Sequence, residues 1–170
     1  MHPFTRITAR KNPKAIFTAM LFGSLLTGLS GLSFALDNTN ASKPLATKNP
    51  AAEALTALNK FHQALQAGNA EAVLALLSDN VVIYESGHGE TRAQYEAHHL
   101  QADITFAKST TATSTNTVVD CDGNLCDIHQ QSHTSGTYKG KTIDSNGTET
   151  AVLRLGTQGW RISHVHWSNQ

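Results

Sequence analysis

The chain has 170 residues, with 13 Lys and Arg against 13 Asp and Glu, so its formal net charge is zero. That balance argues against a nucleic-acid-binding protein, and two cysteines are too few for a disulfide-built miniprotein or a four-cysteine zinc module. The length predicts at most one globular domain. Nine histidines are many for this length and are the first compositional indication of chemistry.

Residues 1–35 have the pattern of a secretory signal peptide. The segment carries basic residues and no acidic ones, then an apolar run over 15–32, and small residues at Ser33 and Ala35, where a signal peptidase cuts. We therefore predict cleavage after Ala35 and a periplasmic or secreted mature protein without membrane contact. The alternative is an uncleaved membrane anchor, since about 20 apolar residues span a bilayer.

The mature chain divides into a tether and one domain. Residues 36–50 are rich in Asn, Ser, Thr, Lys and Pro, a composition that cannot bury enough apolar surface to order itself. We interpret this segment as a flexible tether. Residues 51–170 then form the predicted folded domain.

Helical periodicity dominates the first half of this domain. Apolar side chains recur every three or four positions from residue 51, which places them on one stripe of a helix that ends at Gly68. Asn69 and Thr91 can each cap a further helix. The predicted helices cover residues 51–67, 70–77 and 92–102, and a short strand covers residues 81–85.

The second half is rich in β-branched residues and glycine-containing turns, which predicts strands. These strands cover residues 104–119, 127–138, 148–155 and 160–167. Helices followed by a run of antiparallel strands predict an α+β fold. We expect the N-terminal helices to pack on a curved antiparallel sheet of about four long strands.

The two cysteines flank a predicted turn. Cys121 and Cys126 stand on either side of residues 122–124, with Gly123 at the centre of the turn. Their spacing does not fit the usual redox dithiol. In an exported protein, a disulfide across a hairpin is the simplest interpretation.

The last predicted strand carries a His-x-His pair. Alternation along a strand places His164 and His166 on the same face as Trp160 and Ile162. If the Trp and Ile are core residues, both imidazoles face inward, at a separation that one metal ion can bridge. The alternative is that both histidines are hydrogen-bonded in a polar core or are exposed to solvent.

Further candidate site residues come from the third helix and from strand ends. Tyr95, His99 and Asp103 are spaced i, i+4, i+8 and share one helix face, so an imidazole lies one turn from a carboxylate. Glu85 ends the first strand, and Glu149 opens the run of the third long strand. We predict that these side chains converge on one pocket, where Tyr95, Glu85 and Trp160 contact a bound ligand.

Three stretches resemble the SnoaL-like branch of the nuclear transport factor 2-like (NTF2-like) superfamily. They are residues 59–69, 80–85 and 159–168, the last of which reads Gly-Trp-Arg-Ile-Ser-His-Val-His-Trp-Ser. The resemblance implies a cone-shaped domain with an internal pocket. It covers members that are isomerases, cyclases, dehydratases and non-catalytic binding modules, so the fold alone does not define the activity. Isomerase members use an aspartate base with a tyrosine and a protonated acid as oxyanion donors, and no residue here aligns with those roles.

The sequence leaves three functions open. In the first, the pocket binds a small ligand or a transition metal, zinc or copper, through His99, His164 and His166, with Glu85, Asp103 or Glu149 in support. In the second, the protein is a metal-free enzyme in which the His99/Asp103 pair acts as the general base on a small organic substrate. In the third, it is a non-catalytic dimeric module.

A homodimer is the predicted assembly. By alternation, Val165 and Trp167 oppose the two histidines of the last strand and would form an apolar patch on the outer sheet face. Such a patch favours association with a second copy. Alternatively, Trp167 packs under the N-terminal tether, and no dimer is required.

Overall fold

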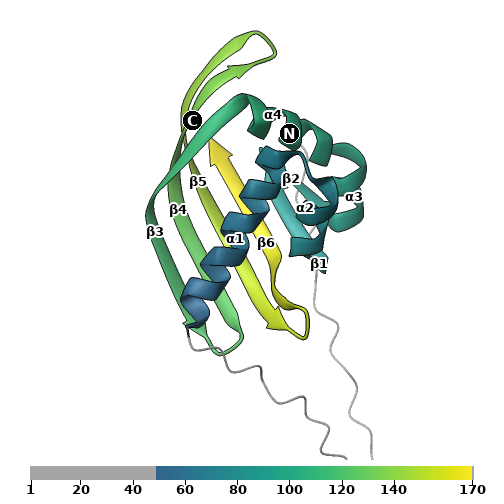
Figure 1. The fold of residues 1–170 in the computed structure, drawn as a ribbon, viewed down its shortest axis with the longest axis vertical. Helices are drawn as coiled ribbons and strands as arrows, with labels where there is room; N and C mark the ends of the chain where they lie inside the picture. The colour runs from purple at the N-terminus through teal and green to yellow at the C-terminus, as the bar shows by residue number, and fades with distance from the viewer. Residues whose placement is uncertain (1–48, 170) are drawn as a thin grey trace, which may run out of the picture. The chain divides into compact units, whose positions relative to one another are not determined.

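The computed structural model describes residues 49–169 (Figure 1), so the predicted signal peptide and almost all of the predicted tether lie outside the described residues. Helix α1 spans Pro50–Ala67. The Asn49 side chain accepts a hydrogen bond from the Ala52 N–H at 3.1 Å, and proline at the first helical position loses no backbone bond. Gly68 ends the helix at φ 75°, as predicted.

A short hairpin follows the second helix. Helix α2 spans Ala70–Leu76, β1 spans Leu77–Glu85 and β2 spans His88–Thr91. The turn residues Ser86 and Gly87 both have positive φ, at 49° and 80°, which matches the twist of a two-residue hairpin. The sequence analysis did not predict β2, because it ended the strand at residue 85 and placed no strand before the helix predicted from residue 92.

The predicted third helix is two helices, α3 over Arg92–His98 and α4 over Leu100–Ser109. The expectation of a strand from residue 104 is wrong for its first six residues. Leu100 and Ile104 are buried one helical turn apart, so packing favours the helix. The hydroxyl of Thr105 also donates to the carbonyl of Gln101 at 2.7 Å, a bond that helical backbone makes available.

Six strands form one sheet in the order β2-β1-β6-β5-β4-β3. Its four long strands confirm the predicted α+β fold, with β1 and β2 added beside β6. All neighbouring pairs are antiparallel except β1 with β6. The long strands are β3 over Thr110–Asp122, β4 over Leu125–Tyr138, β5 over Lys141–Gly156 and β6 over Gly159–Asn169.

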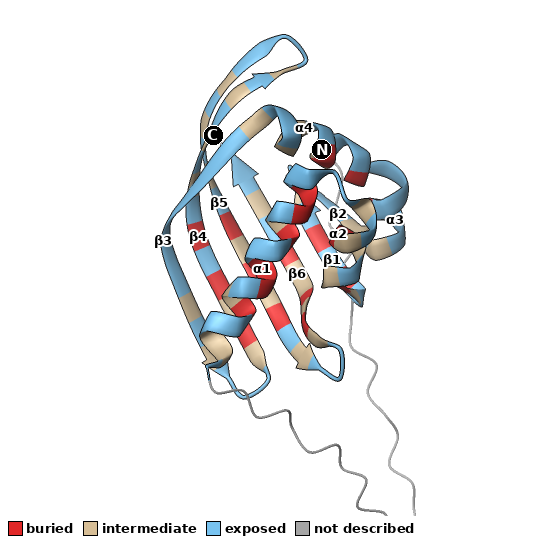
Figure 2. Ribbon diagram, viewed as in Figure 1, coloured by how far each residue is buried: buried red, intermediate tan, exposed pale blue. Residues whose placement is uncertain are grey.

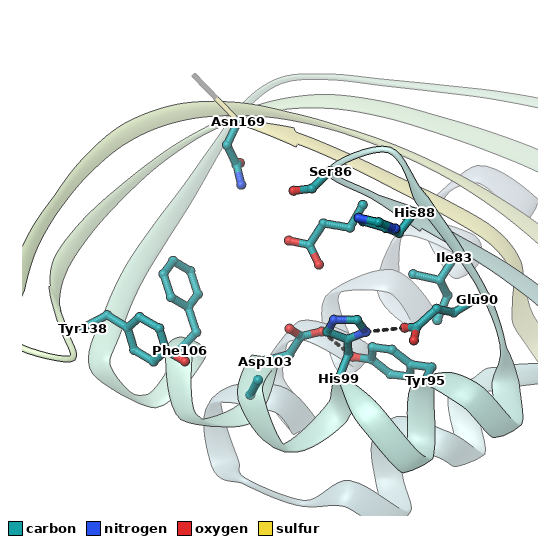
Figure 3. A pocket seen from close by; sticks show the side chains of 12 residues that line it. Ile83, Ser86, His88, Glu90, Tyr95, His99, Asp103, Phe106, Tyr138 and Asn169 are labelled. Carbon is teal, nitrogen blue, oxygen red and sulfur yellow. Dashed lines mark hydrogen bonds and ion pairs between the residues drawn. The ribbon is translucent and has the colours of Figure 1, made fainter. Parts of the chain in front are cut away.

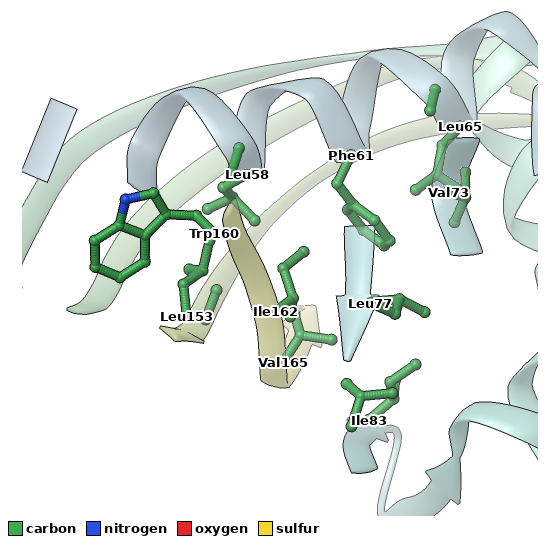
Figure 4. Packing of buried hydrophobic residues seen from close by; sticks show 14 of the residues in the cluster. Leu58, Phe61, Leu65, Val73, Leu77, Ile83, Leu153, Trp160, Ile162 and Val165 are labelled. Carbon is green, nitrogen blue, oxygen red and sulfur yellow. The ribbon is translucent and has the colours of Figure 1, made fainter. Parts of the chain in front are cut away.

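The core lies between α1 and the concave face of the sheet, where buried residues face one another (Figure 2). Leu58 and Phe61 project from α1 onto Leu153 and Ile162 of the sheet (Figure 4). Trp160 belongs to this core and is 7% exposed. It lines neither lobe of the cavity between the helices and the sheet, so its predicted contact with a ligand stays a prediction.

A β-bulge in β6 overturns the predicted orientation of its histidines. Ile162 pairs with Leu153 of β5, but His164 pairs with the next residue back along β5, Val152, so one residue of β6 is extra. An extra residue inverts the alternation beyond it. Val165 is therefore fully buried, whereas His166 is exposed.

The predicted disulfide is present. Cys121 and Cys126 pair across the β3–β4 hairpin, with their Cα atoms 4.1 Å apart. No helix within residues 49–169 is long and apolar enough to cross a membrane.

Replacing both cysteines by serine should lower the free energy of unfolding by about 2 kcal/mol, because the bond closes a short loop in the unfolded chain. Urea denaturation of the oxidised wild type and the double variant measures this difference. Wild type that is kept reduced by a phosphine reductant is the matched control and should resemble the variant, since alkylation of the buried Cys126 would itself disturb the core. Equal midpoints for oxidised and reduced protein would contradict the prediction.

Candidate functional site

A cavity of two adjoining lobes lies between the helices and the concave face of the sheet. The first lobe has a volume of about 360 Å³ and the second about 350 Å³. Four residues line both lobes, so the lobes share a wall: Glu85, Asp103, Phe106 and Asn169. The first lobe (Figure 3) is otherwise lined by Ile83, Ser86, His88, Glu90, Tyr95, His99, Ala102 and Tyr138.

A hydrogen-bonded Tyr–Asp pair stands at this shared wall. Tyr95 projects from α3, is 1% exposed, and donates its hydroxyl hydrogen to Oδ2 of Asp103 at 2.8 Å. Asp103 lies in the first turn of α4. His99 separates α3 from α4, and the Tyr95 and Asp103 side chains meet across this junction.

The surroundings of Asp103 favour its protonated form. Burial and the Glu85 carboxylate raise the pKa of Asp103 and the hydrogen bond from Tyr95 lowers it, and the net result is a pKa of about 6. Burial and the Asp103 charge both raise the pKa of Tyr95, so its hydroxyl stays protonated and remains a donor. The carboxyl group therefore titrates near neutral pH while its partner does not.

His99 lines the same lobe and is held by Glu90 of β2. Its Nδ1 lies 2.6 Å from Oε2 of Glu90, and about half of its side chain is exposed. The hydrogen bond with Glu90 raises the pKa of His99, and the charges of Glu90 and Asp103 add to this. The sequence analysis missed Glu90; the Ser86–Gly87 hairpin signal before it would have placed it on a strand.

Glu85 ends β1 on the inward face and lines both lobes. Within residues 49–169 its carboxylate makes no side-chain hydrogen bond or ion pair, whereas Asp103 has Tyr95. The structure thus places Glu85, Tyr95, His99 and Asp103 around one cavity, as expected. Their roles in binding or catalysis stay predictions.

A second polar cluster lies in the second lobe, around the buried Glu149 of β5. Its Oε2 is 3.0 Å from Nε2 of His62 on α1 and also accepts from the Gln130 amide of β4. Its Oε1 accepts from Nε1 of Trp167 on β6 at 2.9 Å. This lobe is lined by Asn59, His62, Gln63, Leu65, Gln66, Ala107, Thr110, Ala112, Ser114, Gln130, Ser132, Thr134, Glu149 and Trp167, besides the shared wall.

These hydrogen bonds keep Glu149 ionised. Burial alone would raise its pKa, but the hydrogen bonds from His62, Trp167 and Gln130 hold the pKa below its ordinary value. The sequence analysis did not select His62 or Gln130. The signal for Gln130 was its alternation with the apolar residues Cys126 and Ile128 on the inward face of β4.

The four predicted metal ligands do not meet. His164 and His166 lie on the outer face beside Tyr84, and Nδ1 of His164 lies 2.9 Å from the carbonyl oxygen of Val82. Glu149 faces the opposite side of the sheet, in the second lobe. These residues therefore do not fit one zinc or copper ion. Within residues 49–169 no group of three or more His, Cys, Asp or Glu side chains is arranged to hold a metal.

Comparisons with known proteins agree with this architecture. The sequence model of the SnoaL-like domain matches residues 54–170. A candidate ketosteroid isomerase from Shewanella frigidimarina is 39% identical over 68% of this chain and 94% of its own, with a TM-score of 0.64. No curated protein matches the sequence.

Two more distant structures share the fold alone. The CaMKII hub of S. rosetta is 17% identical, with a TM-score of 0.63, over 74% of this chain and all of its own. A candidate dehydratase of the NTF2-like family from Streptomyces avermitilis is 15% identical, with a TM-score of 0.62, over 71% of this chain and 96% of its own. One fold thus carries both a candidate enzyme and an association module.

Proposed function

The chain belongs to the SnoaL-like domain family, and we propose on that premise that its cavity binds a small organic molecule and that Asp103 moves a proton on it. One observation carries the proposal: the carboxyl group stands at the wall common to both lobes, hydrogen-bonded by the buried Tyr95 hydroxyl. A general base works best when its pKa lies close to the working pH. Burial has brought the pKa of Asp103 to about 6.

The proposed reaction is proton abstraction from the carbon next to a carbonyl group, as in an isomerase. Asp103 takes the proton, and the negative charge passes to the carbonyl oxygen of the substrate. Tyr95 positions the carboxyl group, since its hydroxyl already donates to Oδ2. His99 lines the lobe, and its Nδ1 donates to Glu90; in the protonated form, which its raised pKa favours, Nε2–H donates to the developing oxyanion. The 39% identity to a candidate ketosteroid isomerase supports this class of substrate.

Deuterium exchange at α-carbons tests the proposal without requiring the natural substrate. A panel of ketones that includes a β,γ-unsaturated ketosteroid and cyclohex-3-enone is incubated with the protein in D₂O, and proton NMR measures the loss of α-protons. Wild type should accelerate exchange over buffer for at least one ketone. Asp120→Asn, which changes an exposed aspartate of β3, should exchange at the wild-type rate. Exchange that is equal in wild type and Asp103→Asn would contradict the role of Asp103.

The outer face of β1 and β6 favours association with a second copy. Val82 and Tyr84 are large apolar residues that are 37% and 48% exposed, and they lie beside His164 and His166. This patch replaces the one predicted from Val165 and Trp167, which the β-bulge turns inward. The similarity to a hub domain supports a homodimer.

Tyr84→Lys should convert such a dimer to a monomer, because it places a charge at the centre of the apolar patch. Light scattering at micromolar concentration measures the mass of the wild type and the variant. Val118→Lys, which changes an apolar residue of β3 that is 59% exposed, is the control and should leave the mass unchanged. A wild-type protein that is already monomeric would contradict the prediction.

We also propose export to an oxidising compartment. The Cys121–Cys126 disulfide supports it, because such bonds persist in the periplasm and outside the cell and are rare in the cytosol. The intact mass of the exported protein should correspond to a chain that begins at Leu36. A mass that retains residues 1–35 would indicate a membrane anchor instead.

A further inference from the structure

The second lobe holds a histidine that the proposed chemistry at Asp103 does not use. His62 lies on α1, about one third of its side chain is exposed, and it lines the lobe. One of its two ring nitrogens, Nε2, lies 3.0 Å from Oε2 of Glu149. Within residues 49–169 no side chain or backbone group is hydrogen-bonded to the other ring nitrogen, Nδ1.

The Glu149 carboxylate determines which nitrogen of His62 carries the proton. Glu149 is 5% exposed, and an ionised carboxylate can only accept hydrogen bonds. Nε2 of His62 must therefore donate, which leaves the lone pair of the neutral ring on Nδ1. Gln130 and Trp167 donate to the same carboxylate and hold it in place. In the neutral ring Nδ1 is thus an acceptor without a protein partner within residues 49–169, at the wall of a cavity.

The rest of the lobe indicates what kind of molecule fits there. Among residues 49–169 no lysine or arginine lines either lobe, whereas carboxylates do, so an anionic ligand is disfavoured. Ser114, Ser132 and Thr134 contribute hydroxyl groups from β3 and β4. Trp167 stacks on Phe61 with ring centroids 6.2 Å apart and presents an apolar surface next to Glu149. A neutral ring compound with a hydroxyl group complements both features.

We propose that the second lobe binds a neutral, hydroxyl-bearing ring compound whose hydroxyl donates a hydrogen bond to Nδ1 of His62, with Glu149 as the positioning residue. This deepens the proposed function, on which it rests for the identity of the cavity as a ligand site. The shared wall at Asp103 places the anchored ring next to the proton-transferring carboxyl group. The distance between the hydroxyl and the reacting carbon then becomes a determinant of substrate choice.

Two naphthalenes that differ in one donor test the proposal. Wild type should bind 2-naphthol about fivefold to tenfold more tightly than 2-methoxynaphthalene, the effect of one hydrogen bond, as measured by fluorescence titration. His62→Phe should remove this difference, and His62→Gln, which keeps an acceptor, should retain part of it. His133→Phe, an exposed histidine of β4, is the matched control and should bind as wild type does.

Nitrogen-15 NMR measures the chemical shifts of the two ring nitrogens, and these would not respond to the ligand if His62 had only a structural role. The neutral ring of His62 should carry its proton on Nε2, and 2-naphthol should shift the Nδ1 resonance. A neutral ring protonated at Nδ1, equal affinity for the two naphthalenes, or no measurable binding of either would overturn the proposal.

The variant Asp103→Asn separates this proposal from the proposed function. It should retain the preference for 2-naphthol even though it cannot exchange α-protons. If wild type shows the preference but exchanges no ketone, the proposed function fails and the His62 site stands. If wild type exchanges ketones but shows no preference, the His62 site fails and the proposed function stands.

Discussion

Asp103→Asn should reduce proton exchange in the cavity by about two to four orders of magnitude, the contribution typical of a general base. An amide has no proton-accepting form at neutral pH, yet its carbonyl oxygen can still accept the Tyr95 hydrogen bond that Asp103 now accepts. The loss should therefore fall on the rate of the chemical step and not on the shape of the cavity. Steady-state kinetics on whichever ketone exchanges fastest would show a lower kcat with a KM close to that of wild type.

The same substitution should stabilise the folded protein at neutral pH. The folded-state pKa of Asp103 is raised to about 6, whereas an unfolded aspartate titrates near 4. Between these values the folded state binds a proton that the unfolded state does not, so this group lowers stability as pH rises from about 4 to 6. Removing the charge should give a gain on the order of 1–2 kcal/mol above pH 6 and none below about pH 4.

Urea denaturation across pH 3.5–8 would show both features of this prediction. The Asp120→Asn control, which changes an exposed carboxylate, should follow the wild-type curve.

Tyr95→Phe should retain more exchange activity than Asp103→Asn, because Tyr95 positions the carboxyl group and does not itself move a proton. If Asp103→Asn were less stable than wild type at pH 7, the carboxylate would stabilise the fold, and the raised pKa on which its role as a base depends would be wrong.

The part of the site that sequence could predict is the part that local periodicity controls. Tyr95, His99 and Asp103 share a face because helical spacing depends only on neighbouring residues. Their grouping survived even though the predicted single helix is two helices, α3 and α4, because the side chains of Tyr95 and Asp103 meet across the junction at His99. The extent of α4 was missed because Ile104 and Thr105 are β-branched and favour strands, a propensity that the tertiary packing of Ile104 overrides.

The histidines of β6 show the opposite case. Alternation from Trp160 and Ile162 is a correct inference for a regular strand, and both residues are indeed buried. One extra residue between the Ile162 and His164 pairings reverses every later side chain, and nothing in the sequence of β6 marks that position. The bulge exchanges the two faces beyond it, so the histidines lie outside the cavity and Trp167 lines it.

The contact between His62 and Glu149 could not be predicted because it joins residues that are far apart in the sequence. His62 and Glu149 are 87 positions apart in the chain and meet only because α1 lies across the concave face of the sheet. A histidine beside Phe61 in an amphipathic helix has no local signal of a buried partner. Glu149 was selected as an inward-facing acid, but its three donors come from three different elements, and a single sequence cannot pair them.

The Glu149 cluster should therefore be the most sensitive polar position of the fold. Glu149→Leu should lower the free energy of unfolding by about 3–5 kcal/mol, because it removes the shared acceptor and leaves the donors of Gln130 and Trp167 buried without a partner. Glu149→Gln, which keeps one acceptor oxygen, should cost only about 1–2 kcal/mol. Glu96→Leu, at an exposed position of α3, is the control and should change stability little.

The pH dependence of this loss follows from the direction of the shift. The folded-state pKa of Glu149 is lowered, so its contribution is fully present above the unfolded pKa, near 4.3, and disappears as pH falls through the lower folded value. The stability gap between wild type and Glu149→Gln should thus be constant from pH 5 upward and narrow in more acidic solution. Urea denaturation at pH 7, 5 and 3 measures it. A gap that widens on acidification would mean that the folded state holds Glu149 protonated, and His62 would then lose the partner that fixes its ring.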